Sequence, residues 1–319
     1  MIKVGIVGCD HQRSAELVRL LINHPDVALM WATATSCEAG TRLDSIVPGI
    51  VGECDLVVAA DADFAAVDLV YLCGSRADVS AWLSSMSIPD SVGVIDLSGS
   101  HNQDAGDGTL WKYGLSEMQR RLLVHDTRLI TVPGNAAIAA LIALMPMARN
   151  QMLNHPLSLR VTLGELAFPL DGKTLDGFSA EEWARDQQRE VVRALGQCQS
   201  SFNQPVELTV GTHAHRRALA VEARFKCGVD IEMVQQLYEQ YYKDHNFVFI
   251  VNRPITIADV ENTNKCLIGL DMDERSGELA VQGMMDLMLK GSAGTAVHAM
   301  NLMFGLHERV GLALKGSGC

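Results

Sequence analysis

The chain has 319 residues, about twice the length of a typical single domain, so we expect two domains. Hydrophobic residues make up 48% of it and charged residues 20%, which excludes a disordered chain. The formal net charge of -12 argues against nucleic-acid or anionic-membrane binding, because no run of basic residues forms a local patch. No apolar stretch reaches the ~20 residues that span a bilayer. The eight cysteines are scattered without a CxxC pair, so we expect a cytoplasmic protein with reduced thiols.

The first part of the chain alternates short apolar runs with a helical pattern. We expect strands at residues 2–7, 68–72, 92–97 and 129–132, each almost entirely apolar, as in a parallel sheet buried on both faces. Between the first two, apolar residues at helical spacing predict a helix that ends before Pro25. The pattern predicts a Rossmann-like, doubly wound α/β domain.

The second part alternates apolar and polar residues, as strands with one exposed face do. Asp230 is a candidate N-cap for a helix with an apolar stripe. A final helix has an apolar face from Ala293 to Phe304, whose methionines we interpret as core packing rather than a binding groove. The predicted strands are 157–163, 219–225, 247–251, 266–270 and 279–282, and the longest loop candidate is 168–178. We predict a mixed α+β domain whose sheet carries helices on one side.

Several segments together carry a resemblance to one family: residues 2–8, 15–25, 94–98, 113–115 with Glu117, 133–134, 262–266, 290–291 and 301–306. From end to end the chain resembles N-acetyl-γ-glutamyl-phosphate reductase, an enzyme of arginine biosynthesis. The resemblance implies a Rossmann-like, NAD(P)-binding-type domain of residues 1–134 with 293–319. It implies a dimerisation and catalytic-type domain of residues 135–292, and a last helix that packs on the first domain.

The resemblance also implies chemistry from which this chain departs. Family members reduce an acyl phosphate with NADPH through a cysteine thioester. The resemblance places Asn135 at the nucleophile position, and a neutral amide cannot form a thioester. It places Arg185 and Gln187 where the family has paired histidines. We therefore assign no catalytic residue.

Three functions remain open at this point. The preferred one is a homologue that has lost or altered the acyl-phosphate reduction and forms a homo-oligomer or a hetero-oligomer with an authentic reductase. The second is an active NADP-dependent reductase that uses nonstandard residues. The third is a module that binds a small anionic metabolite, with Arg13, Arg76 and Arg217 facing the cleft.

The cofactor implied by the resemblance is NADP, but its positions depart as well. The family places glycines three apart in the first turn, where backbone N–H groups approach a pyrophosphate. Here a bulky His11 replaces the middle glycine and Asp10 adds a negative charge. The candidate cofactor positions are Gly8, Asp10, His11, Gln12, Arg13, Ser36, Gly74, Ser75, Ser98 and Leu287.

Two features are candidates for binding an anion. Arg217 is either a clamp for a substrate carboxylate or an exposed charge at a strand end. Gly134 and Asn135 either present N–H groups to an anion or begin the helix at 136–147 with Asn135 as its N-cap, which we prefer.

Two further pairs of residues have a functional and an ordinary interpretation. His213 and His215 lie two apart, as a metal pair on a strand would, but no third ligand is near, so we expect no metal site. Cys9 and Cys73 follow strands where ligands approach in this fold, so either is a candidate for a relocated nucleophile. We prefer to interpret both as buried packing residues.

Overall fold

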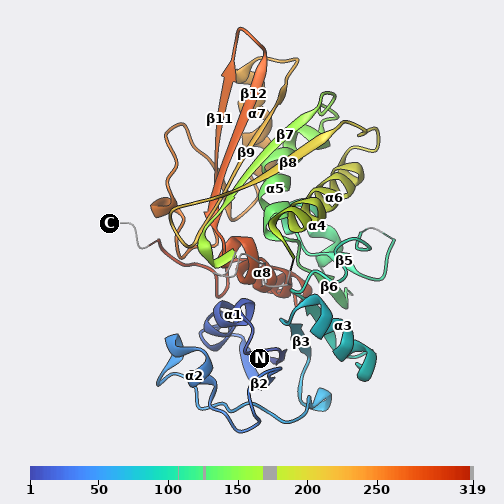
Figure 1. Ribbon diagram of the computed structural model, residues 1–319, viewed down its shortest axis with the longest axis vertical. Coiled ribbons are helices and arrows are strands. Elements are labelled where there is room, and N and C mark those ends of the chain that lie inside the picture. Colours follow the sequence, from blue (N-terminus) through green and yellow to red (C-terminus); the bar gives the residue numbers. More distant parts are fainter. Residues whose placement is uncertain (107, 125–126, 168–177, 317–319) are drawn as a thin grey trace. The chain divides into compact units, whose positions relative to one another are not determined.

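The computed structural model describes residues 1–106, 108–124, 127–167 and 178–316, which form two compact units (Figure 1). The first unit comprises Met1–Pro133 with Ser292–Ala313, and the second comprises Gly134–Gly291 with the segment from residue 314. Most of the predicted loop 168–178 lies outside the described residues. Among the described helices, none combines the length and apolar character needed to cross a membrane.

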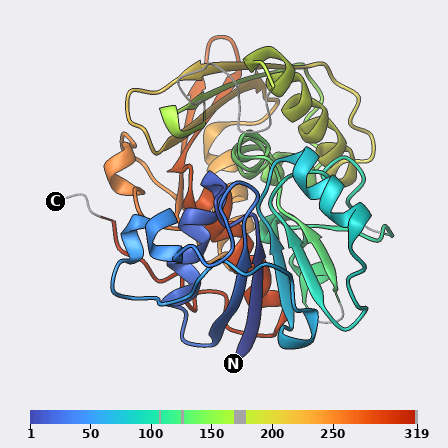
Figure 2. The ribbon, with the colours of Figure 1, turned by 60° about the horizontal axis from the view of Figure 1, so that its bottom comes forward.

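The first unit is built on a six-stranded sheet of order β2-β1-β3-β4-β6-β5, in which every described pairing is parallel (Figure 2). Its strands are β1 (Ile2–Val7), β2 (Val27–Thr33), β3 (Leu69–Leu72), β4 (Gly93–Asp96), β5 (Lys112–Tyr113) and β6 (Leu129–Thr131). The four predicted strands and the parallel sheet are therefore confirmed. Their side chains are buried on both faces, which explains why these runs are apolar throughout.

Helices cover both faces of this sheet. They are α1 (Gln12–Ile22), α2 (Leu43–Ile46), α3 (Arg76–Ser85), α4 (Ser116–Leu123) and α8 (Gly294–Met303). On one face Val79 of α3 packs into a cluster with Trp31, and a Cβ at Gly5 would lie 2.3 Å from that indole. The last helix, α8, packs against α1 and α4 and is buried on all sides. Its methionines therefore belong to the core, as predicted.

The second unit contains a mixed sheet of order β10-β11-β12-β9-β7-β8. Its strands are β7 (Leu157–Leu163), β8 (Val206–Thr212), β9 (Ala218–Lys226), β10 (Val248–Ile250), β11 (Cys266–Asp273) and β12 (Glu278–Asp286). The pairs β7–β8 and β10–β11 are parallel and the remaining described pairs are antiparallel. The predicted mixed α+β architecture is confirmed.

Three helices pack on one face of this sheet: α5 (Asn135–Arg149), α6 (Ala180–Cys198) and α7 (Ile231–Tyr242). Asp230 caps α7 as predicted, because its side chain accepts the N–H of Met233 at 2.8 Å. The central helix α5 continues through Pro146, which has no N–H to give to the carbonyl of Ile142. The hydroxyl of Tyr242 donates to that carbonyl instead, so the acceptor that the proline leaves open has a partner.

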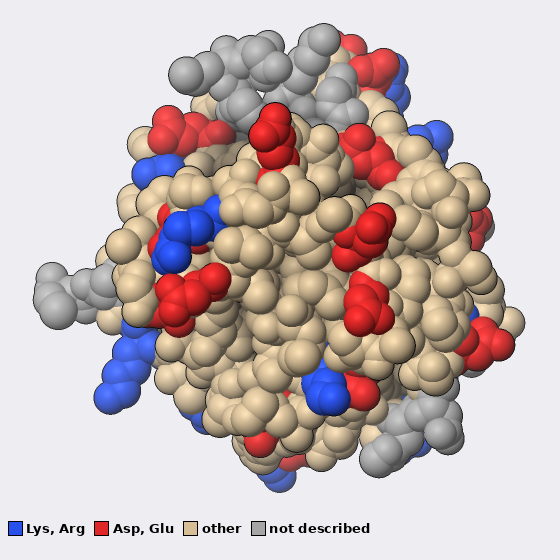
Figure 3. Space-filling model, turned by 90° about the horizontal axis from the view of Figure 1, so that it is seen from below, with Lys and Arg blue, Asp and Glu red and all other residues tan. Residues whose placement is uncertain are grey.

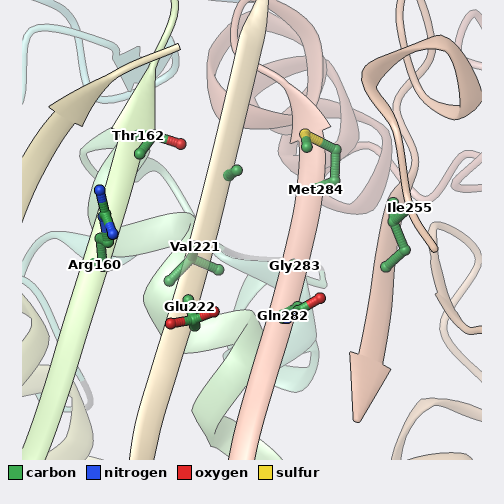
Figure 4. A pocket seen from close by; sticks show the side chains of 9 residues that line it. Arg160, Thr162, Val221, Glu222, Ile255, Gln282, Gly283 and Met284 are labelled. Atoms are coloured by element: carbon green, nitrogen blue, oxygen red, sulfur yellow. The ribbon is translucent and has the colours of Figure 1, made fainter. Parts of the chain in front are cut away.

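The opposite face of the sheet presents polar and small side chains from β7, β9 and β12. There an open cavity of about 250 Å³ is lined by residues that include Arg160, Glu222, Gln282 and Met284 (Figure 4). Arg224 pairs with Glu222 at 2.6 Å on the same strand and with Glu278 of β12 at 3.2 Å. This face therefore alternates charges with small residues.

Candidate functional site

The order of the first sheet reverses between β1 and β3, and ligands of such folds bind outside the carboxyl ends of the strands at this reversal. Gly8 follows β1 with a φ of +79°, and a Cβ at this position would lie 2.9 Å from the backbone nitrogen of Gly74 after β3. Position 8 therefore favours glycine for two reasons, the positive φ and the close approach of the Gly74 backbone. The structure brings Gly8 and Gly74 together at the point where a nucleotide is expected.

The start of α1 is capped by the chain itself. His11 is the N-cap residue, and its Nδ1 accepts the backbone N–H of Arg13 at 3.3 Å. Arg13 in turn donates from Nη1 to the carbonyl of Gly74 at 3.4 Å. A pyrophosphate at a helix N-terminus uses such N–H groups. In this chain the imidazole of His11 takes one of them.

Asp10 makes a second internal contact at this edge of the sheet. Its carboxylate accepts the N–H of Thr35 at 3.0 Å and that of Ser36 at 2.6 Å, and both hydroxyls also donate to it. Thr35 and Ser36 follow β2, so the contact links the turns after two neighbouring strands. Partial burial alone raises the pKa of Asp10, but the hydrogen bonds from Ser36 and Thr35 outweigh it and hold that pKa below its ordinary value.

Ser75 and Ser98, two more of the predicted cofactor residues, make hydrogen bonds within the chain. Ser75 caps α3 in a reciprocal arrangement with Asp78. Ser98 donates its hydroxyl to Asp96 at 2.6 Å. Leu287 lies in the second unit, where its side chain is buried and its N–H donates to the carbonyl of Arg217 at 2.8 Å.

The structure adds a group that sequence reasoning missed. The fully buried Asp96, at the end of β4, lies 3.0 Å from Nδ1 of His101, whose ring stacks on Trp111 with centroids 3.8 Å apart. The contact with Asp96 and the stacking on Trp111 together fix the orientation of this imidazole. A histidine five residues after an aspartate at a strand end was the signal that could have found it.

Cys9 and Cys73 both belong to the packed interior of the first unit, 1% and 0% exposed. Burial, followed by the nearby charge of Asp10, raises the pKa of Cys9 to about 12. Burial also raises the pKa of Cys73 well above that of an ordinary thiol. Since the thiolate is the nucleophilic form, neither side chain is prepared for attack on a carbonyl.

In the second unit, α5 begins at the predicted nucleophile position. Gly134 is its N-cap residue and Asn135 is the first helical residue, so the prediction of Asn135 as the N-cap is wrong. The reason is that other side chains accept the first N–H groups. Glu190 of α6 accepts the N–H of Gly134 at 3.1 Å, and Gln187 accepts that of Ala137 at 3.2 Å.

The two residues predicted at the family's histidine positions behave differently. Gln187 is buried against the start of α5, and a Cβ at Gly134 would lie 2.2 Å from its amide. Arg185 is exposed on α6. Asn135 directs its own Oδ1 to the N–H of Ala136 at 2.9 Å. The N–H groups of Gly134, Ala136 and Ala137 therefore all have acceptors within the chain.

Arg217 is only 18% exposed, so the interpretation as an exposed strand-end charge is wrong. Its Nε and Nη2 bind the two oxygens of Asp286 at 2.8 and 3.0 Å. Asp286 is fully buried and also accepts the N–H groups of Asn262, Met288 and Leu289. The guanidinium fork that a substrate carboxylate would need is thus used inside the protein.

His213 and His215 lie in the loop between β8 and β9. The Nδ1 of His213 accepts the N–H of His215 at 3.0 Å, and the Nδ1 of His215 accepts that of Arg217 at 3.3 Å. The remaining nitrogen of His215 lies 3.4 Å from Glu261. Both rings therefore shape the loop.

On the face drawn in Figure 3, acidic side chains are scattered and the described basic ones form no continuous patch.

Comparison with known proteins places the chain in a family. The model of the semialdehyde dehydrogenase NAD binding domain matches residues 3–125, and that of the semialdehyde dehydrogenase dimerisation domain matches residues 186–286. The N-acetyl-γ-glutamyl-phosphate reductase of Parabacteroides distasonis is 32% identical over 329 aligned positions, with 99% of each chain covered. That of Phocaeicola vulgatus is 33% identical over 325 positions, again with 99% of each chain covered.

Solved structures share the fold at low sequence identity. Aspartate semialdehyde dehydrogenase II of Vibrio cholerae superposes with a TM-score of 0.71 at 13% identity, covering 95% of this chain and 98% of that one. Aspartate semialdehyde dehydrogenase from Candida albicans, solved with NADP, gives a TM-score of 0.69 at 13% identity with the same coverage. By its full-length similarity and both of its domains, the chain belongs to the N-acetyl-γ-glutamyl-phosphate reductase family.

Proposed function

We propose that this chain is a member of the family that has lost the thioester route of acyl-phosphate reduction and serves as a non-catalytic subunit. The observation that carries the proposal is the start of α5. Asn135 stands at the nucleophile position, and its amide oxygen accepts the neighbouring N–H of Ala136. An amide offers no ionisable nucleophile, so no covalent acyl intermediate forms there.

The surroundings of Asn135 also disfavour a thiolate. An activated cysteine needs a cation or a base beside it, which lowers its pKa and takes its proton. The neighbouring α6 presents the neutral Gln187 and the carboxyl group of Glu190 to this helix start. Gln187 carries neither a positive charge nor a basic nitrogen, so it neither takes the proton of a thiol nor stabilises a thiolate. The site is therefore unsuited to the family chemistry in more than one residue.

The two alternative functions have less support. An active reductase with nonstandard residues needs another nucleophile, and Cys9 and Cys73 are buried thiols with raised pKa values. A small-anion module needs donors directed at a ligand, whereas Arg217 is held by Asp286.

The open face of the second sheet supports the role of a subunit. We propose that a second copy of the chain packs on the face around the cavity of Figure 4, because the matching dimerisation-domain model covers β8, β9, β11 and β12 of this sheet; association with an authentic reductase instead is an outcome of the test. Light scattering after gel filtration tests this: Ala220→Arg, in the centre of the face, should shift the protein towards monomer. Gln236→Arg, on the exposed side of α7, is the matched control and should leave the mass unchanged. A monomeric wild-type protein that also fails to associate with an authentic reductase would refute the subunit role.

The activity assay is the direct test of the lost reaction. The chain and the relative from Bacteroides thetaiotaomicron are incubated with N-acetylglutamate semialdehyde and phosphate, with NADP⁺ or NAD⁺ in parallel. We expect turnover from an authentic reductase and none from this chain with either nucleotide. Phosphate-dependent turnover comparable to that of the relative would overturn the proposal.

A further inference from the structure

The turn after β2 forms a compact set of hydrogen-bond donors. The backbone N–H groups of Thr35 and Ser36 and their two hydroxyls all point at the carboxylate of Asp10. The two oxygens of Asp10 lie 3.0 and 3.1 Å from the nitrogen of Thr35, so the carboxylate approaches the turn with both. Successive N–H groups that converge in this way form a binding site for an anion.

The environment of this turn favours the negatively charged form of Asp10. Partial burial opposes ionisation of Asp10, yet the hydrogen bonds from Ser36 and Thr35 reverse that effect and lower its pKa. The donors therefore stabilise a negative group over a neutral one. Asp10 fills this site from a turn 25 residues away in the sequence.

The position of the turn indicates which ligand group would otherwise meet these donors. In doubly wound folds the adenosine ribose of a dinucleotide lies near the carboxyl end of the strand beside β1. An acidic side chain there accepts the ribose 2′-hydroxyl of NAD, whereas cationic or donor groups hold the 2′-phosphate of NADP. The acidic residue usually follows that strand directly, but in this chain the turn itself offers Thr35 and Ser36, and the carboxylate comes from the turn after β1.

We infer that Asp10 selects against the 2′-phosphate of NADP, and that the first unit takes the dinucleotide with an unmodified 2′-hydroxyl. The carboxylate holds the four donors that a 2′-phosphate would need, and it places a like charge beside any phosphate that approaches. The residues therefore do not fit NADP, the cofactor that the family resemblance implied. This inference requires nucleotide binding by the first unit and is independent of the lost thioester reaction.

Calorimetric titration of the full chain tests the inference with four probes: NAD⁺, NADP⁺, adenosine 2′-monophosphate and inorganic phosphate. The variants are Asp10→Ala, which removes the carboxylate, and Asp10→Asn, which removes only the charge. Asp55→Asn is the matched control, because its side chain is 98% exposed and it removes the same formal charge. In the Asp10→Ala background, Thr35→Val removes one hydroxyl donor and should reverse part of any gain.

We expect the wild type to bind NAD⁺ at least tenfold more tightly than NADP⁺. In Asp10→Ala, the affinity for NADP⁺ relative to that for NAD⁺ should rise by tenfold or more. This variant should also bind adenosine 2′-monophosphate, and phosphate should raise its thermal stability. Asp55→Asn should show none of these changes. The inference is overturned if the wild type prefers NADP⁺ or if Asp10→Ala leaves the preference unchanged. Absence of binding of all four probes by every variant would equally overturn it. None of these outcomes depends on turnover, so they are separable from the activity assay above.

Discussion

In both units, side chains of the chain itself accept backbone N–H groups at the predicted sites. The two units differ in how exposed these accepting side chains are to solvent. In the first unit the acceptor is Asp10, a partly exposed residue on a turn. In the second unit the acceptors are Gln187 and Glu190, which are 1% and 0% exposed on α6. Asp10 is therefore reachable from solvent, whereas Gln187 and Glu190 belong to the core.

The physical reason is the cost of an unpaired donor. A buried N–H group without a partner costs about 1–3 kcal/mol, whereas one at the surface regains water. Displacing Glu190 therefore disrupts the start of α5, while displacing Asp10 frees a solvent-accessible site. The following predictions test this difference, beginning with the largest expected effect.

The buried pair of the second unit should be the most sensitive. Asp286→Ala removes the carboxylate that binds the guanidinium of Arg217 and accepts three backbone N–H groups. We expect a loss of about 3–5 kcal/mol in the free energy of unfolding, measured with urea. Asp271→Ala, exposed on the adjacent β11, should change it by less than about 0.5 kcal/mol. Equal effects of the two variants would contradict a structural role for Asp286.

Removal of Glu190, the buried acceptor at the start of α5, should have an intermediate effect on stability. Glu190→Ala takes away the acceptor of the Gly134 N–H, and we expect a loss of about 2 kcal/mol in the free energy of unfolding. Glu190→Gln keeps an oxygen at this position and should lose less. If Glu190→Ala were as stable as the wild type, the start of α5 would have to be solvated, and the contrast with Asp10 would disappear.

The contribution of Asp10 should depend on pH in a defined direction. Its folded-state pKa lies below the ordinary value of 3.8, so its stabilisation is fully present above that value and is lost as the pH falls through the folded-state pKa. The difference in unfolding free energy between the wild type and Asp10→Asn should be constant at neutral pH and shrink below about pH 4. Urea titrations from pH 7 to pH 3 measure it. A difference that grows on acidification would show that the carboxylate is not the stabilised form.

The smallest expected effect is that of placing a cysteine at the predicted nucleophile position. Asn135→Cys should show no phosphate-dependent turnover, because Gln187 supplies neither a base nor a cation beside the new thiol. Its alkylation by iodoacetamide, followed by mass spectrometry, should be slow compared with that of a free thiol. Asn135→Ser is the control for the change in shape. Measurable turnover by Asn135→Cys alone would mean that the missing cysteine was the only defect.

Local patterns were predictable because neighbouring residues alone decide them. The apolar run of β1 and the cap of α7 by Asp230 both depend on residues within one strand or one helical turn. Asn135 shows the limit of such reasoning. It has the preferred residue type for an N-cap, but Glu190 of α6 already accepts the N–H of Gly134, which lies 56 residues earlier in the chain. A local rule could not anticipate that acceptor.

The sequence alone determined the fold class, the family and the amide at position 135, because these depend on periodicity, motif and residue identity. Only the tertiary structure decided that Asp10 occupies the turn at Thr35 and that Arg217 is held by Asp286. These partners are 25 and 69 residues apart, and they meet because the sheet order places their strands side by side. Hydrogen bonds over such separations depend on the path of the chain, which no local pattern encodes.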